Sequence, residues 1–215
     1  MAKRPRQSGL VRTGQQMMST SRSASSAGAS ARGVVNSACP GTDILTGMTY
    51  DFRQDANTTA NRSDYFPSSN VGNSTTFSFR FRVDDATATD GILFEMGTSA
   101  ASFGTTYWMT TGGVLHGRCG ISGDMELSYT STGDGEVIEV VVGIDNVNHK
   151  HWINGAKDPA TAARTLNQPW ANAPLIGYGL PNGSVAHAGA AAVTLAGATL
   201  LSPLCVFIDK LPPTF

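Results

Sequence analysis

The sequence predicts an all-β protein with one folded domain and an N-terminal appendage. Only 14% of its 215 residues are charged, glycine is abundant with 24 copies, and helical periods are scarce. Apolar residues alternate or run in short stretches between Gly-rich turns, which is typical of antiparallel strands. A chain of this length can bury one sizeable core, and all-β sandwiches of similar size commonly form a single domain.

The N-terminal residues differ in composition from the rest of the chain. Residues 19–33, STSRSASSAGASARG, hold no large apolar side chain, so burial offsets little of the entropy lost on ordering them. The first 33 residues contain six of the 15 basic residues and no acid, so the remainder has nine basic and sixteen acidic residues and a net charge of −7. The six basic residues of this segment are Lys3, Arg4, Arg6, Arg12, Arg22 and Arg32. We therefore expect a partner-binding arm over 1–38, ordered only by outside contacts, and a body over 39–215.

Targeting signals and cysteines indicate the cellular compartment in which the protein is made. No apolar stretch of about seven residues follows the basic start, and no run of about eighteen is present, so we expect synthesis in a cytosol without membrane insertion. A transit peptide and a short nuclear address, KRPR, remain open alternatives. The three cysteines, Cys39, Cys119 and Cys205, are odd in number and lack metal-site spacing. We expect free, mostly buried thiols.

The body begins with its clearest strand, TTFSFRFRV over 75–83. Its alternation places Phe77, Phe79, Phe81 and Val83 on one face and Ser78, Arg80 and Arg82 on the other. This pattern predicts a half-buried strand. After the polar loop DDATATD, the nearly continuous apolar run GILFEMG over 91–97 suits a central strand.

Shorter strands and a hairpin follow. The β-prone runs TTYWMTT (105–111), GVLHGRCGI (113–121) and MELSYT (125–130) are separated by turn residues and indicate a meander. EVIEVVVGID (136–145) is the strongest strand, and HKHWING (149–155) returns from it and ends in the tight turn Asn154-Gly155. Within this return strand, we expect His149, His151 and Ile153 on one face and Lys150 and Trp152 on the other. LCVFI (204–208) suits a last strand or a docking segment.

A family resemblance rests on this hairpin. A long apolar strand ending at Asp145, a short turn and a strand closing in Trp-Ile-Asn-Gly resemble the central hairpin of laminin-G-like or concanavalin A-like jelly-roll domains, such as those of phage virion proteins. Residues 75–97 resemble the early strands of that family, and PLIGYG (174–179) and AAVTLAGATLLS (191–202) resemble its closing strands. The resemblance covers roughly residues 45–205. It implies a two-sheet antiparallel jelly-roll sandwich whose concave side serves lectins for sugars and hydrolases for polysaccharides.

No catalytic pattern is apparent. Hydrolases of this fold carry a Glu-x-Asp-x-Glu strand, because nucleophile and acid must lie about 5–5.5 Å apart, and the sequence lacks it. The nearest carboxylate pairs are Asp124 with Glu126, beside a turn, and Glu136 with Glu139, on opposite strand faces. We expect a protein that is not an enzyme and uses no cofactor.

Several residues are candidates for ligand binding. Loop aspartates Asp84, Asp85 and Asp90 are weak calcium candidates without the EF-hand spacing. His149 and His151 share a strand face but lack a third metal ligand in view, so we expect exposed hairpin histidines. The aromatic residues that could stack on a sugar are Tyr107, Trp108, Trp152, Trp170 and Tyr178, with core packing as the alternative for most of them.

Three functions compete. The basic arm favours a structural virion protein, a decoration or cement protein of a tailed-phage capsid, present in many copies or as a homo-oligomer and made in the host cytoplasm. Its arm would bind the major capsid protein or other virion subunits, with DNA contact possible but not favoured. The alternative is a carbohydrate-binding module of a phage fibre or head appendage that contacts a cell-surface glycan. The missing carboxylates disfavour a polysaccharide hydrolase.

Overall fold

The computed structural model of the protein describes residues 39–61, 74–97, 104–119, 127–145, 148–158, 175–181 and 193–215. The predicted arm, 1–38, lies outside the described residues. In the described ranges, no helix combines the length and the hydropathy needed to cross a membrane.

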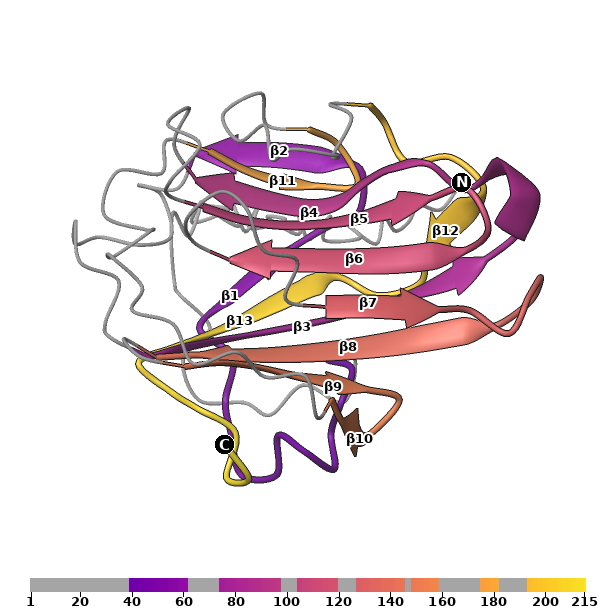
Figure 1. Cartoon of the computed structure of the whole chain (residues 1–215). Coiled ribbons are helices and arrows are strands. Elements are labelled where there is room, and N and C mark those ends of the chain that lie inside the picture. Colours follow the sequence, from indigo (N-terminus) through magenta and orange to yellow (C-terminus); the bar gives the residue numbers. More distant parts are fainter. Residues whose placement is uncertain are drawn as a thin grey trace, which may run out of the picture.

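Two antiparallel sheets pack against each other as a sandwich, which confirms the predicted fold class (Figure 1). Among the described residues, sheet A has seven strands, of which six follow the order β1 (Phe52–Gln54), β13 (Leu204–Ile208), β3 (Thr75–Val83), β8 (Val137–Ile144), β9 (His149–Ile153) and β10 (Ala156–Lys157). The seventh, β12 (Ala198–Leu200), also pairs with β3. In the same described ranges, sheet B has six strands in the order β2 (Thr58–Asn61), β11 (Leu175–Tyr178), β4 (Gly91–Gly97), β5 (Gly104–Thr110), β6 (Val114–Cys119) and β7 (Leu127–Thr130).

The main core lies between the two sheets. The apolar side chains of β3 face those of β4, β5 and β11, and their aromatic rings are buried. Phe77 and Phe94 bring their ring centroids to 4.9 Å, and Phe79 meets Tyr107 edge-on at 5.7 Å. Alternation along each strand therefore builds this core, as the sequence pattern predicts.

The predicted strands are present, and two details follow from residue type. GILFEMG forms β4, which lies in the middle of sheet B. β8 and β9 form the predicted hairpin, and β9 turns into β10 at Asn154 and Gly155, with φ of 49° and 81°. Positive φ at both central residues is what a type I′ hairpin turn requires, and Asn-Gly favours it.

The outer face of sheet A is also covered, which the sequence pattern does not predict. Cys205, Ser78, Val141 and Trp152 share one row across four strands of this face, and residues 39–48 pack over them. A Cβ at Gly41 would lie 2.3 Å from a Val141 methyl group, so this close approach requires glycine. β3 is consequently buried on both faces over 75–78 and half-buried only from Phe79 onward.

The prediction of free thiols is wrong for two of the three cysteines. Cys39 and Cys205 form a disulfide, with Cα atoms 5.9 Å apart, that joins the covering segment to β13. The two cysteines are 166 residues apart in the chain, and only the fold brings them together. The cysteine count could not predict this disulfide, because three cysteines can be three free thiols or one bonded pair and one free thiol.

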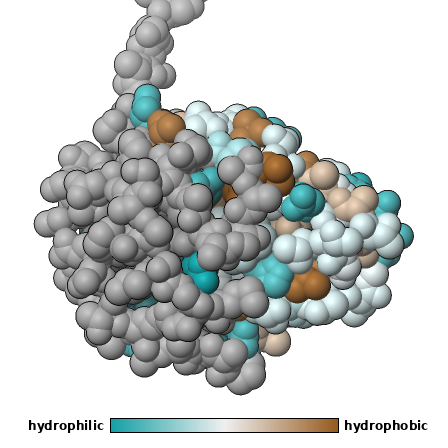
Figure 2. Space-filling model, turned by 45° about the horizontal axis from the view of Figure 1, so that its top comes forward, coloured by the Kyte–Doolittle hydropathy of each residue, from teal (hydrophilic) through white to brown (hydrophobic). Residues whose placement is uncertain are grey.

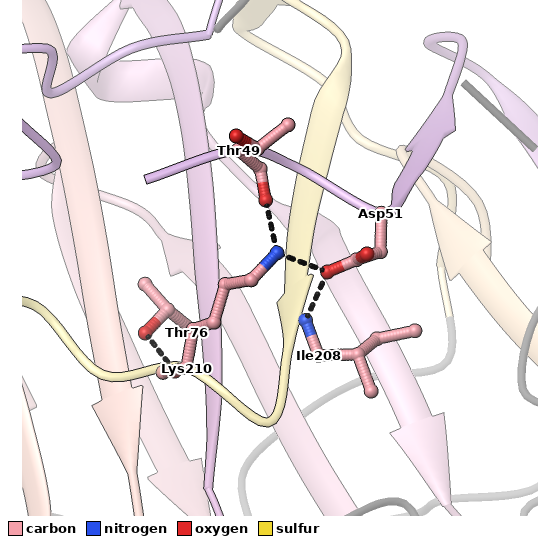
Figure 3. Close-up of polar contacts among 5 residues, drawn as sticks. All are labelled: Thr49, Asp51, Thr76, Ile208 and Lys210. Atoms are coloured by element: carbon pink, nitrogen blue, oxygen red, sulfur yellow. Dashed lines mark hydrogen bonds and ion pairs between the residues drawn. The ribbon is translucent and has the colours of Figure 1, made fainter. Parts of the chain in front are cut away.

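Polar contacts fasten the end of the chain beside the same segment (Figure 3). Lys210 Nζ donates to the Thr49 carbonyl at 2.7 Å and pairs with Asp51 Oδ2 at 2.8 Å. The Asp51 carboxylate also accepts from the Ile208 N–H at 3.1 Å, and Thr76 Oγ1 donates to the Lys210 carbonyl at 2.9 Å. These bonds hold residues 208–210 against β1 and β3.

Candidate functional site

Polar and charged side chains gather on the outer face of sheet B. Strand register places Glu95 of β4, Thr106 of β5 and Arg118 of β6 side by side, and we call these three residues the polar row. Their exposed fractions are only 1%, 0% and 4%. Charged residues are rarely buried this deeply without partners, and both Glu95 and Arg118 make polar interactions.

A second row lies beside the first on the same face. Trp108 of β5 and His116 of β6 face each other in register, with stacked rings 5.1 Å apart at 26°. Thr110 Oγ1 lies 3.0 Å from His116 Nε2, and burial lowers the pKa of His116 below its ordinary value. Uncharged imidazole is therefore the favoured form of His116 at neutral pH.

Three buried polar atoms of these rows have no hydrogen-bond partner in the described part of the chain. They are Thr106 Oγ1, Trp108 Nε1 and His116 Nδ1. A buried polar group without a partner costs free energy, so such atoms commonly mark a place where a ligand or solvent completes the pairing.

Exposed positions on the edge strands flank this buried middle. Thr59 and Asn61 of β2 are exposed at one edge of sheet B, and Ser128 and Thr130 of β7 are exposed at the other. On the face shown in Figure 2, the described residues are mostly pale or teal, with brown residues in separate spots rather than one broad patch. The described surface seen there is therefore suited to polar rather than broad apolar contacts.

The sequence pattern alone does not single out the polar row. Glu95 is the one charged residue in the apolar run GILFEMG, and Arg118 is the one charged residue in GVLHGRCGI. A lone charge inside a buried strand is a usable signal, because it needs a partner or a function. Their alignment across three strands depends on sheet order, which the sequence does not display.

Four of the five candidate stacking residues belong to described segments, and all four are buried. Tyr107 and Tyr178 belong to the core between the sheets, with no exposed surface, and Trp108 and Trp152 are each 3% exposed. Burial raises the pKa of Tyr178, whose hydroxyl donates to the Ser202 carbonyl. Trp170 lies outside the described residues.

The three aspartates proposed for calcium make separate local contacts. Asp84 accepts from Thr199 and pairs with Arg82, and these hydrogen bonds lower its pKa. Asp85 caps the short 3₁₀ helix η2 (Ala86–Ala88) through Thr87, and Asp90 accepts from the Gly91 N–H. Across the described ranges, no three His, Cys, Asp or Glu side chains are grouped to hold a metal ion.

The carboxylate pairs considered for hydrolysis are also placed. Glu136 accepts hydrogen bonds from the Tyr129 hydroxyl at 2.7 Å and from the Thr132 N–H at 2.5 Å, and the bond to Glu136 raises the pKa of Tyr129. Glu139 lies outward beside Asn154, and the Asn154 side chain accepts a hydrogen bond from the backbone N–H of Glu139. Asp124 and Glu126 lie outside the described residues.

The expectation of exposed hairpin histidines is wrong. β9 pairs with β8 along its length and with β10 only at its end, and His149 and His151 point into the sandwich toward Tyr107 of sheet B, with 1% and 0% of their surface exposed. Both Nε2 atoms approach the Tyr107 hydroxyl, His149 at 2.9 Å and His151 at 2.7 Å. We call Tyr107, His149 and His151 the Tyr–His–His cluster.

The sequence matches no protein-family model and no curated protein. Among solved structures, the K499G mutant of NanB sialidase from Streptococcus pneumoniae aligns with 82% of this chain at a TM-score of 0.52 and 14% identity. This chain spans only 27% of that sialidase. The CBM40 of Ruminococcus gnavus IT-sialidase, bound to alpha2,6 sialyllactose, aligns over 80% of this chain and 95% of its own length. Its TM-score is 0.50 and its sequence identity is 14%. These likenesses show a shared sandwich fold.

Proposed function

We propose that this protein is a lectin-like carbohydrate-binding module whose glycan site lies on the outer face of sheet B. The observation that carries the proposal is the polar row together with two buried polar atoms that have no hydrogen-bond partner among the described residues, Thr106 Oγ1 within the row and Trp108 Nε1 beside it. Sugar hydroxyls both donate and accept, so they can pair with a carboxylate, a guanidinium and an indole N–H at once. The CBM40 with the same fold, which was solved with sialyllactose bound, supports this reading.

We further propose that the module binds glycans without cleaving them. Retaining hydrolysis needs two carboxyl groups about 5–5.5 Å apart across the scissile bond. The polar row contributes one carboxylate, Glu95, and its charged counterpart across β5 is Arg118. A carboxylate and a guanidinium can hold a sugar by hydrogen bonds but cannot perform that double displacement.

The test is a glycan array with neutral and acidic oligosaccharides, including sialyllactose and lactose, followed by calorimetry on any ligand found. We expect Arg118→Gln to weaken binding at least about tenfold, the effect of losing one charge-assisted hydrogen bond. Arg53→Gln is the matched control, because Arg53 is exposed on β1 of the other sheet. Unchanged affinity in Arg118→Gln, or no glycan bound at millimolar concentration, would refute the proposal.

A second candidate function rests on the charge of the first 33 residues. Six basic and no acidic side chains there favour an arm that binds virion subunits, as in a capsid decoration protein. The Cys39–Cys205 disulfide removes one sequence argument for it, the expectation of unpaired cysteines. If this function is correct, a chain lacking residues 1–33 should fold yet fail to join the particle, as measured by its copy number in purified particles. Normal incorporation would exclude an anchoring arm.

A further inference from the structure

The Tyr–His–His cluster joins the two sheets through one phenol oxygen. Tyr107 belongs to β5 of sheet B, whereas His149 and His151 belong to β9 of sheet A. Gly117 of β6 leaves room for the phenol ring, because a Cβ there would lie 2.4 Å from a Tyr107 ring carbon. The imidazole centroids are 4.3 Å apart. Two basic groups thus lie side by side in the buried core.

Donor counting fixes the protons of this cluster. The Tyr107 hydroxyl has one proton to donate, so at most one of the two Nε2 atoms accepts from it and at least one donates to it. His151 Nδ1 is buried and has no hydrogen-bond partner among the described residues. An unpaired buried N–H is rarer than an unpaired buried acceptor. His151 therefore carries its proton on Nε2 and donates to Tyr107, and in the proposed arrangement Tyr107 in turn donates to Nε2 of His149, whose proton is on Nδ1.

We propose that the Tyr–His–His cluster is an acid-sensitive bridge: protonation of its imidazoles breaks the hydrogen bonds through Tyr107 and loosens sheet A from sheet B. A proton added to His149 Nε2 removes the acceptor that Tyr107 uses. A proton added to His151 Nδ1 places an N–H and a positive charge in the core without a described partner. Both changes cost free energy that unfolding or opening would relieve.

The surroundings of the cluster favour the neutral imidazoles. Val142 and Ile144 of β8 pair with His151 and His149, and neither carries charge. Asp145 directly follows β8, and Asp158 follows β10 and donates its N–H to the His151 carbonyl, so these are the nearest acids along the chain.

The other described strands packed against the cluster add no cation. Gly117 and Leu127, on β6 and β7, follow Tyr107 in the same row, and Tyr129, the next inward residue of β7, bonds to Glu136. Acids would raise an imidazole pKa, but burial dominates and lowers the pKa of His151 to about 3.

The direction of the pH effect follows from the difference between the pKa of His151 in the folded chain and its pKa in the unfolded chain. In the unfolded chain the His151 imidazole binds a proton below about pH 6.5, whereas in the folded chain it binds one only near pH 3. The unfolded state thus holds more protons between these values, so stability falls as the pH falls through this window. Two other side-chain links between the sheets, from Gln54 to the Ile176 carbonyl and from Tyr178 to the Ser202 carbonyl, do not change charge in acid.

The experiment is urea unfolding of the full chain at pH 7.5 and pH 5.0. We expect that lowering the pH from 7.5 to 5.0 raises the equilibrium constant for unfolding about thirtyfold through His151 alone. The His151→Gln variant should lack this thirtyfold increase. His116→Gln is the control, because His116 is only half-buried and belongs to the outer face of sheet B, so its increment should be smaller. An equal pH dependence in wild type and His151→Gln, or an equal loss in His116→Gln, overturns the proposal.

A second measurement keeps the proposal testable if His151→Gln does not fold. Nitrogen NMR of the wild-type histidines should show opposite tautomers for His149 and His151 at pH 7.5. It should also show no protonation of His151 in the folded protein at pH 5.0. The same tautomer at both positions, or titration of His151 near pH 6.5, contradicts the assignment.

Discussion

Phe79 lies in the middle of β3, where its ring has no exposed surface. It meets aromatic rings from three strands of sheet B: Phe94 at 6.5 Å, Tyr107 at 5.7 Å and Tyr178 at 6.1 Å. Replacing Phe79 by alanine leaves a cavity between the sheets, so we expect a loss of about 3–5 kcal/mol of unfolding free energy in urea titrations.

The neighbouring Arg80 provides the control for this prediction. Its side chain is half-buried on the outer face of sheet A beside Glu139, and its backbone N–H, which alanine keeps, donates to Ser202 Oγ. We expect Arg80→Ala to cost under about 1 kcal/mol, as surface substitutions commonly do. Reversed costs for the two variants would place the wrong face of β3 in the core.

At the scale of elements, regular strands were predictable and the segment over sheet A was not. Alternation in residues 75–83 and the Asn154-Gly155 turn are local signals, and both β3 and the β9–β10 turn follow them. Residues 39–48 have no period, because they pack as irregular chain against Val141 and Trp152. Only contacts between distant segments determine that burial.

The disulfide between Cys39 of this covering segment and Cys205 should contribute to the stability of the fold. Joining residues 166 positions apart restricts the unfolded chain, so we expect reduction to lower stability by about 2–5 kcal/mol. The melting temperature should therefore fall by several degrees when a reductant is added, as differential scanning calorimetry can measure. A Cys39→Ser variant should show the lowered value with and without reductant. Identical melting curves for oxidised and reduced wild type would mean that the thiols are unpaired.

At the scale of the whole molecule, the sandwich could be predicted but the candidate site could not. Apolar alternation and turn residues determine which segments are strands, and the resemblance of residues 45–205 to jelly-roll domains indicated two sheets. The polar row joins residues 95, 106 and 118 only because β4, β5 and β6 are neighbours in register. Likewise, the burial of His149 and His151 depends on which face of β9 packs against sheet B, where Tyr107 lies.

The link between Cys39 and Cys205 also gives the folded body the connectivity of a closed ring. Every strand from β1 to β12 lies on the chain between these two residues, and β13 contains Cys205 itself. A protease that cuts one loop within this ring linearises it but releases no fragment. The nicked protein therefore keeps its full mass until the disulfide is reduced, and its strands remain tethered at high effective concentration, ready to pair again.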